Sequence, residues 1–306
     1  MGNEYDVVII GGGTAGLTAG MYAARANKKT LIIEKAIIGG QITYTHQIDN
    51  FPAAQGLSGV EYSMKLQEQA ESFGAKIELD EILDMDYKEG DIVLKGTSKE
   101  YHAKALILAT GLKHRRMGVE REESLIGSGI SFCAVCDGAF FKDAEVAVYG
   151  GGNTALEDAI FLSDTCKKVT IIHRRDQFRG EEHLEAVLRS KPNVEFAMNK
   201  TVSKIHGEYA ISGLTLHDKV TGQDSELNIS GLFVAIGQIP DSKPFDEMIE
   251  TDRSGFFDNG ENCKTSKPGI FVAGDCRTKD VRQLTTAAAD GSVAAVAACS
   301  YVDSIR

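Results

Sequence analysis

The stretch YDVVIIGGGTAGLTAGMYAARANKKTLIIEK, residues 5–35, decides the fold. Residues 7–10 are a continuous run of valine and isoleucine that predicts a buried strand, and residues 17–26 are rich in alanine and other helix formers. A G-x-G-x-x-G turn joins them, made by Gly11, Gly13 and Gly16. A side chain in such a turn would block both the tight bend and the approach of a pyrophosphate to the helix N-terminus. The stretch therefore predicts a strand, a turn and a helix that bind a dinucleotide.

An acidic residue completes this first unit. Glu34 closes the second strand, about twenty residues after the turn, where a carboxylate can accept hydrogen bonds from ribose hydroxyls. The alternative is a glycine turn with a purely structural role. The strand, helix and acid in the expected order favour the dinucleotide site.

The same pattern recurs in residues 145–175, EVAVYGGGNTALEDAIFLSDTCKKVTIIHRR, where Gly150, Gly152 and Ala155 repeat the turn. In place of Glu34, this copy ends in four basic residues, which are His173, Arg174, Arg175 and Arg179. Guanidinium groups can hold a ribose 2'-phosphate with paired hydrogen bonds, whereas a carboxylate would repel it. The second unit therefore favours NADP over NAD, although a charged run can also be only the solvated face of a helix.

A pair of cysteines followed by an aspartate lies in SFCAVCDGAFF, residues 131–141. A zinc site would need two more ligands, and the sequence has no second CxxC and no HxxxH, so no metal is expected. Two unrelated buried cysteines are a second alternative. A redox pair is favoured, because a CxxC at the start of a helix brings the sulfurs of Cys133 and Cys136 within bridging distance and lowers the thiol pKa.

Asp137 follows this pair directly. Its carboxyl could protonate a leaving thiolate, or accept a proton, during thiol–disulfide exchange. It could equally be an N-cap, and the two roles can coexist. The candidate catalytic residues are thus Cys133, Cys136 and Asp137.

Composition limits the class of protein. A length of 306 residues favours two domains, and 42% hydrophobic with 25% charged residues is typical of a globular protein. The formal charge of -11 argues against general binding to nucleic acid or to an anionic membrane. The N-terminus shows no basic leader, and no apolar run is long enough to span a bilayer, so a cytoplasmic location is expected.

With CAVCDG between the two dinucleotide units, the chain resembles the low-molecular-weight, bacterial-type thioredoxin reductase family from about Tyr5 to its end. The supporting motifs are GGGTAG, GGQI at 39–42, ATG at 109–111, CAVCDG, GGGNTA, HRR, GIFVAGD at 269–275 and RQLTTAAADG at 282–291. Thr14 departs from the family, which usually has proline there, and Val135 replaces a common threonine. Neither change removes a reacting group.

The resemblance implies an α/β fold of two Rossmann-like dinucleotide-binding domains, in class II of the pyridine nucleotide-disulfide oxidoreductases, with the second inserted into the first. An FAD-binding domain is expected at residues 1–114 and 245–306, and an NADPH-binding domain that carries the dithiol at 115–244. The buried GIFVAGD strand and the alanine-rich helix after it would complete the first sheet. The resemblance also implies a homodimer, in which rotation of the inserted domain presents nicotinamide and dithiol to the flavin in turn.

By the same resemblance, candidate site residues can be assigned to each cofactor. Asp275 is expected on the ribityl chain of the flavin, with Arg282 and Gln283 near the isoalloxazine. The full set expected for FAD is Gly11, Gly13, Thr14, Ala15, Gly16, Glu34, Gly40, Gln41, Asn50, Thr110, Gly111, Gly274, Asp275, Arg282, Gln283 and Leu284. The set expected for NADPH is Gly150, Gly152, Asn153, Thr154, His173, Arg174, Arg175 and Arg179.

The implied function is NADPH-dependent reduction of a thioredoxin disulfide through FAD and the Cys133–Cys136 pair, with thioredoxin or a thioredoxin-like protein as partner. One alternative is a thioredoxin reductase fed by reduced ferredoxin, against which the GGGNTA and HRR motifs argue. Another is a ferredoxin- or flavodoxin-NADP reductase-like flavoenzyme, a class that lacks the dithiol. A nucleotide-sensing protein with a vestigial site is the alternative without enzymatic activity.

Overall fold

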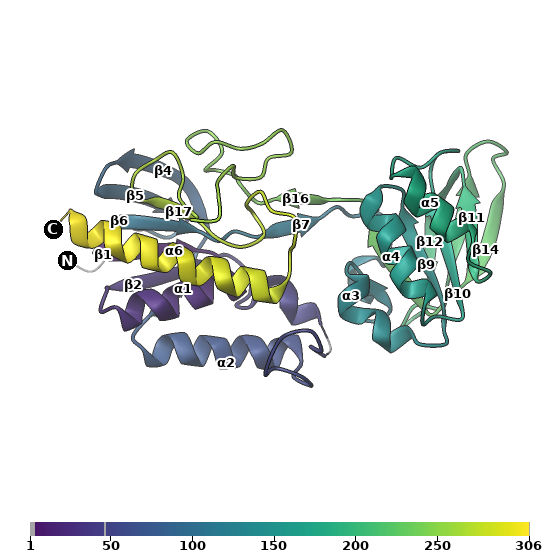
Figure 1. The fold of residues 1–306 in the computed structure, drawn as a ribbon, viewed down its shortest axis with the longest axis horizontal. Coiled ribbons are helices and arrows are strands. Elements are labelled where there is room, and N and C mark those ends of the chain that lie inside the picture. Colours follow the sequence, from purple (N-terminus) through teal and green to yellow (C-terminus); the bar gives the residue numbers. More distant parts are fainter. Residues whose placement is uncertain (1–3, 46, 306) are drawn as a thin grey trace. The chain divides into compact units, whose positions relative to one another are not determined.

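The computed structural model describes residues 4–45 and 47–305, and these residues fall into two units. The first unit consists of Met1–Thr43, Phe51–Lys113 and Ile239–Arg306, and the second consists of Tyr44–Asn50 and His114–Gln238. The first unit is therefore discontinuous in sequence. Each unit is built around its own sheet (Figure 1).

The main sheet of the first unit has the strand order β3-β2-β1-β6-β5-β4, with β17 pairing on β6. The strands are β1 (Glu4–Ile10), β2 (Thr30–Glu34), β3 (Lys76–Leu79), β4 (Ile82–Lys88), β5 (Asp91–Gly96), β6 (Glu100–Leu108) and β17 (Ile270–Val272). The pairs β1–β2, β2–β3, β1–β6 and β6–β17 are parallel, whereas β4–β5 and β5–β6 are antiparallel. The GIFVAGD strand, which is β17, completes this sheet as predicted.

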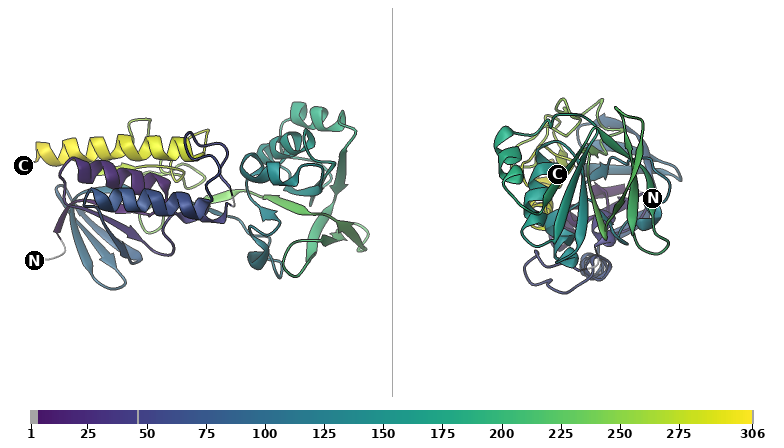
Figure 2. Two further views of the ribbon diagram at one scale, coloured as in Figure 1. Left: turned by 90° about the horizontal axis from the view of Figure 1, so that it is seen from below. Right: turned by 90° about the vertical axis from the view of Figure 1, so that its right-hand side faces the viewer.

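Two helices, α1 (Thr14–Arg25) and α6 (Leu284–Ser304), lie side by side on one face of this sheet (Figures 1 and 2). Small residues let them approach closely, since a Cβ on Gly291 of α6 would lie 2.3 Å from the carbonyl oxygen of Ala15. Alternate strand residues such as Val7 and Ile9 pack under these helices, and Val8 points to the opposite face. A third helix, α2 (Gly59–Ser72), contacts α1, and the 3-10 helix η1 (Gly40–Tyr44) follows β2.

The second unit contains a parallel sheet with the order β11-β10-β9-β15-β8 and an antiparallel sheet with the order β12-β13-β14. The strands are β8 (Ile130–Ser131), β9 (Glu145–Gly150), β10 (Lys168–His173), β11 (Val194–Met198), β12 (Lys200–His206), β13 (Gly213–Asp218), β14 (Asp224–Asn228) and β15 (Gly231–Ala235). The helices are α3 (Ala134–Asp137), α4 (Asn153–Ser163) and α5 (Glu182–Arg189), with the 3-10 helices η2 (Glu123–Leu125) and η3 (Gly138–Phe141).

The parallel sheet of the second unit has two apolar faces. Val146, Val148 and Ile171 pack with α4 and α5, whereas Ala147 and Ile172 on the other face pack with the antiparallel sheet. Strands buried on both faces are rich in β-branched residues, and all four residues of VTII before His173 are buried.

The two segments that connect the units, β7 (Leu112–His114) and β16 (Gln238–Pro240), pair with each other as a two-stranded sheet. The backbone N–H of Arg115 donates to the carbonyl of Gly237 at 3.0 Å just beyond this pair. Across the residues that the structure describes, no helix is both long and apolar enough to cross a membrane.

Candidate functional site

The glycine turn of the first unit lies where three chain segments meet. A Cβ on Gly11 would lie 2.2 Å from the carbonyl oxygen of Ala109, and a Cβ on Gly274 would lie 2.8 Å from the Cβ of Ala15. Gly11 has φ +107° and Gly274 has φ +81°, so both positions also need glycine for backbone reasons. The structure therefore brings the predicted segments 11–16, 109–111 and 274–275 together just beyond the carboxyl ends of parallel strands, where α/β sheets bind their ligands.

The turn leads directly into the N-terminus of α1. Gly13 is the N-cap, and a Cβ there would lie in ordinary contact, 3.7 Å from the Gly39 carbonyl oxygen. Thr14 and Ala15 are buried in the first turn of α1. The first N–H groups and the dipole of this helix favour an anion at the turn.

Glu34 fixes the turn from the end of β2. Its Oε2 accepts a hydrogen bond from the backbone N–H of Gly12 at 2.7 Å, and its Oε1 accepts one from the N–H of Ala36 at 2.8 Å. Each carboxylate oxygen retains capacity for a further hydrogen bond. Glu34 therefore also fixes the shape of the turn. The sequence pattern predicted its ribose contact but did not indicate this second role.

Asp275 presents a buried acceptor beside this turn. Its Oδ1 is buried and has no hydrogen-bond partner among residues 4–45 and 47–305. Burial raises the pKa of this carboxyl, and Lys279 and Arg282 offset part of the effect. A buried oxygen of this kind costs stability unless a ligand or water satisfies it, so a hydroxyl-bearing ligand such as the ribityl chain fits at Asp275.

Arg282 is held near Asp275 by backbone carbonyls. Its Nε donates to the carbonyl of Asp275 at 3.2 Å and its Nη2 donates to that of Arg277 at 3.3 Å. Gln283 and Leu284 follow at the start of α6, where the N–H of Gln283 donates to the Thr286 hydroxyl at 3.1 Å. These predicted residues thus form one continuous segment.

The remaining residues predicted to contact FAD are more dispersed. Gly40 and Gln41 begin η1, and the Gln41 side chain donates to the carbonyl of Leu112 at 2.6 Å. Asn50 is exposed and is grouped with the second unit. Thr110 and Gly111 follow one residue after the end of β6.

The second glycine turn has the same close approach. A Cβ on Gly150 would lie 2.3 Å from the carbonyl oxygen of Ala235 and 2.6 Å from the Cβ of Ala155. At Gly152, by contrast, a Cβ would meet no described atom within 4 Å. Gly152 is the N-cap of α4, as Gly13 is the N-cap of α1, so the unobstructed position lies at the helix N-terminus.

His173 is buried under this second turn. A Cβ on Gly151 would lie 2.2 Å from its Nδ1, and its Nε2 lies 3.1 Å from the carbonyl oxygen of Gln177. Burial lowers the pKa of His173, hydrogen bonds to the backbone of Gln177 and Gly150 offset part of this effect, and the net lowering favours the neutral ring near pH 7. Its contacts join the turn to the basic segment that follows.

The guanidinium-bearing residues of that segment are exposed, namely Arg174, Arg175 and Arg179. The N–H of Arg179 donates to the carbonyl of Gly151 at 2.7 Å, which brings this segment against the glycine turn. Asn153 and Thr154 are exposed at the start of α4, and Asn153 exchanges two hydrogen bonds of 2.9 Å with Glu181. The structure therefore gathers the residues predicted for NADPH at one end of the parallel sheet.

Cys133 and Cys136 form a disulfide with a Cα–Cα distance of 5.3 Å. Cys133 is the N-cap of α3, and its Sγ accepts a hydrogen bond from the N–H of Cys136 at 3.2 Å. A sulfur in this position gains from the dipole and the N–H groups of the helix turn, which stabilise a thiolate after reduction. Val135 between the cysteines and Phe140 after them are exposed.

Asp137 is the last residue of α3. Its Oδ2 accepts a hydrogen bond from the Ser131 hydroxyl at 2.6 Å, and that hydroxyl oxygen also accepts one from the N–H of Cys133 at 3.1 Å. Cys133 is the N-cap of α3, whereas Asp137 occupies the N-cap position of the following helix η3 without a side-chain capping hydrogen bond. Ser131 was missed, and its place two residues before the CxxC is the signal that could have identified it.

Asp158 is a further acidic residue next to the dithiol helix. It lies on α4, which packs against α3, and its carboxyl accepts a hydrogen bond from the N–H of Ala134. Burial, reinforced by the charge of Glu157, raises the pKa of Asp158 to about 7. Sequence analysis did not identify this residue.

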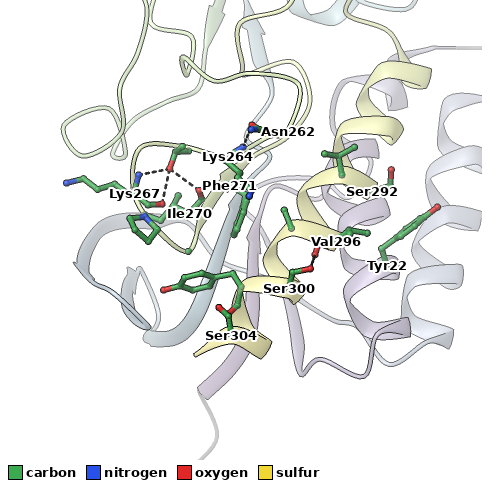
Figure 3. Close-up of a pocket in the computed structure, with 16 residues that line it drawn as sticks. Tyr22, Asn262, Lys264, Lys267, Ile270, Phe271, Ser292, Val296, Ser300 and Ser304 are labelled. Atoms are coloured by element: carbon green, nitrogen blue, oxygen red, sulfur yellow. Dashed lines mark hydrogen bonds between the residues drawn. The ribbon is translucent and has the colours of Figure 1, made fainter. Parts of the chain in front are cut away.

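A separate groove of about 760 Å³ runs along α6 in the first unit (Figure 3). Its walls include Tyr22, Phe271, Val296 and Tyr301, and none of its lining residues belongs to the predicted sites. Figure 3 shows Tyr22 and Ser292 on one side of it and the segment from Asn262 to Phe271 on the other. The groove therefore lies apart from the residues predicted to contact FAD and NADPH.

Comparison with known proteins decides the family. The model for the pyridine nucleotide-disulphide oxidoreductase family matches residues 5–291. The thioredoxin reductase of Bacillus subtilis is 44% identical over 304 residues, which cover 99% of this chain and 96% of that protein. The chain belongs to the pyridine nucleotide-disulphide oxidoreductase family. Within it, thioredoxin reductases align with nearly the whole chain.

Two further relatives support the same conclusion. The thioredoxin reductase of Listeria monocytogenes is 41% identical, with 99% of this chain and 95% of that protein covered. The crystal structure of thioredoxin reductase from Streptococcus pyogenes has a TM-score of 0.93 and 38% identity, with 99% of this chain and 100% of that chain covered. The resemblance to thioredoxin reductases and the prediction of two Rossmann-like dinucleotide-binding folds are confirmed.

Proposed function

We propose that this chain reduces the disulfide of a thioredoxin with electrons from NADPH, relayed by FAD and by Cys133 and Cys136. The observation that carries this proposal is the CxxC disulfide at the start of α3, in a chain that also has two dinucleotide turns. FAD and NADPH are the cofactors of this family. The proposed reaction is thus that of a thioredoxin-disulfide reductase.

FAD is assigned to the proposed domain at residues 1–114 and 245–306, which contains the glycine turn of the first unit. The turn at Gly11–Gly16 would hold the pyrophosphate, Glu34 the ribose and Asp275 the ribityl chain, with Arg282 and Gln283 near the isoalloxazine. The helix N-terminus at Gly13 and the unsatisfied oxygen of Asp275 support the assignment. When bound, FAD supplies the chemistry of accepting a hydride from a nicotinamide and passing two electrons to a disulfide.

NADPH is assigned to the proposed domain at residues 115–244, which contains the glycine turn of the second unit. The turn at Gly150–Asn153 would hold the pyrophosphate. Arg174, Arg175 and Arg179 would hold the 2'-phosphate, and their exposure on a segment fixed to the turn supports this role. His173 is assigned an organising role, because its ring is buried and neutral.

The dithiol performs the exchange with the partner. Reduction of the Cys133–Cys136 bond by two electrons yields two sulfurs that need two protons for full neutralisation. One thiolate attacks the thioredoxin disulfide and releases a partner thiolate, and the second then attacks the mixed disulfide and releases the reduced partner. Asp137, hydrogen-bonded to Ser131 beside the pair, would hold and return a proton in these steps.

Rapid-mixing spectroscopy of the FAD-loaded protein tests the proposal. We expect NADPH to bleach the flavin absorbance much faster than NADH, and thioredoxin added afterwards to restore it. A Cys136→Ser variant should retain bleaching by NADPH and lose thioredoxin reduction. If reduced ferredoxin bleaches the flavin and NADPH does not, the donor assignment is wrong. Thioredoxin turnover retained by the Cys136→Ser variant would remove the dithiol from the mechanism.

The assembly and location are proposals that rest on the family. We assign a homodimer, to be checked by light scattering, and a cytoplasmic location. Cys166, Cys263, Cys276 and Cys299 are buried free thiols in the structure, which suits a reducing compartment.

A further inference from the structure

One buried carboxylate on α6 holds several points of the segment that follows β17. The Oδ2 of Asp290 accepts hydrogen bonds from the N–H of Gly274 at 3.0 Å, from Nε of Arg277 at 2.8 Å and from Nζ of Lys279 at 2.8 Å. Its Oδ1 accepts a further one from Nη2 of Arg277 at 3.0 Å. A single side chain thus binds the segment at three positions within six residues.

This cluster is buried. Arg277 is 2% exposed and Asp290 is 5% exposed, and the side chain of Lys279 is 5% exposed. Burial alone would raise the pKa of Asp290, but the hydrogen bonds from Arg277 and Lys279 outweigh it and keep the pKa below its ordinary value. Asp290 is therefore an anion that compensates two buried cations, while Glu261 also pairs with Arg277 at 3.0 Å.

The segment held in this way, residues 274–282, is named the Asp275 loop. At its start, Gly274 has φ +81°, and its N–H is fixed by Asp290. Asp275 follows with its unsatisfied Oδ1, and at the end Arg282 is fixed by the carbonyls of Asp275 and Arg277. These contacts lie in the same short segment that the bidentate pair between Asp290 and Arg277 holds at its middle.

We infer that Asp290 is a positioning residue for the flavin site, which holds the Asp275 loop in the shape that receives the ribityl side of FAD. The inference rests on the proposed assignment of FAD to the first unit. Its physical basis is preorganisation, since a loop already fixed in its bound shape loses less conformational entropy when a ligand binds. Asp290 itself is not proposed to contact FAD; it acts through its hydrogen bonds to Gly274, Arg277 and Lys279.

Release of FAD from the purified holoenzyme tests this inference through the gain in flavin fluorescence, without any turnover. We expect Asp290→Asn to release FAD at least tenfold faster than the wild type, because an amide places N–H groups against Arg277 or Lys279. Arg277→Lys keeps the charge but loses the bidentate geometry, and it should release FAD about threefold faster. Backbone hydrogen exchange of residues 273–283 should rise in both variants.

A matched control separates positioning from general loss of stability. Val302→Ala creates a cavity at a fully buried position of the same helix, away from the Asp275 loop, and should lower the melting temperature while leaving the rate of FAD release within twofold. If Asp290→Asn does not fold with FAD, the comparison of Arg277→Lys with Val302→Ala decides the question.

The outcomes distinguish this inference from the proposed function. A wild-type protein that neither contains nor takes up FAD contradicts the proposed function. A wild type that holds FAD, together with an Asp290→Asn or Arg277→Lys variant that releases it no faster than Val302→Ala does, contradicts the positioning role alone. In that case Asp290 would only stabilise the packing of α6.

Discussion

Ser131 is a single residue that links the backbone of the dithiol to its neighbouring acid. Its hydroxyl donates to Asp137 at 2.6 Å and accepts from the N–H of Cys133 at 3.1 Å. Ser131→Ala should therefore slow thioredoxin turnover about tenfold, the effect of one lost charge-assisted hydrogen bond of roughly 1.5 kcal/mol. Steady-state turnover with thioredoxin measures this, and NADPH-driven bleaching of the flavin should remain within twofold of wild type.

Ser203→Ala is the matched control for this substitution. The hydroxyl of Ser203, an exposed position on β12 of the antiparallel sheet, donates to the carbonyl of Thr215 at 3.1 Å. Its loss should leave both half-reactions within twofold. Equal turnover by Ser131→Ala and Ser203→Ala would show that the Asp137 carboxyl does not depend on Ser131.

At the scale of elements, the packing of α4 against α3 places a carboxyl with an altered pKa beneath the dithiol helix. Burial and Glu157 raise the pKa of Asp158 to about 7 from an ordinary value of 3.8. The folded state therefore binds more protons than the unfolded state between these values. The stability from the bound proton is fully present below about pH 4 and is lost as the pH rises through 7.

Asp158→Asn removes the titrating carboxyl and, with it, this contribution to the pH dependence of stability. Between pH 5 and pH 8 the wild type should lose stability that the variant keeps, so the difference in the free energy of unfolding (variant minus wild type) should rise by about 1–2 kcal/mol. A full pKa shift would give roughly 1.4 kcal/mol per unit, and partial solvation of the side chain reduces this. Urea unfolding at both pH values, followed by circular dichroism, measures the difference. Glu157→Gln should reduce the same pH dependence, and parallel pH profiles of wild type and Asp158→Asn would refute the assignment.

Elements whose signals are local could be predicted from the sequence. The run at residues 7–10, the glycines after it and the alanine-rich helix are adjacent in sequence, so propensity and periodicity indicate β1, the turn and α1 together. The helix begins earlier than residue 17, at Thr14, because Gly13 already serves as its N-cap. The same local reasoning found β9, α4 and β10.

Contacts between distant elements could not be predicted in this way. Asp290 lies 16 residues after Gly274, and only the packing of α6 against the sheet brings its carboxyl to that N–H. His173 reads as the first residue of a basic run, yet its ring is buried under Gly151 because it ends a strand of the parallel sheet. The sequence pattern fixes residue types, whereas burial depends on which elements cover them.

At the scale of the whole molecule, different residues are proposed to bind NADPH, which reduces the flavin, and to carry out the exchange with thioredoxin. The net charge of -11 repels NADPH, so local guanidinium groups must outweigh the general field. The exposed Arg174 and Arg175 supply them next to the second glycine turn. Residues that hold the 2'-phosphate should affect the use of NADPH and leave the exchange with thioredoxin unchanged.

The double variant Arg174→Gln/Arg175→Gln tests this separation. Two lost contacts of roughly 1.5 kcal/mol each should raise the KM for NADPH about 100-fold, while kcat at saturating NADPH and the KM for NADH stay within threefold. Lys204→Gln/Lys219→Gln, which removes the same charge from exposed positions on or beside the antiparallel sheet, is the control and should change the KM for NADPH less than threefold. An equal rise in KM for both nucleotides, or for both double variants, would mean that the arginines act only through the general field and do not select the 2'-phosphate.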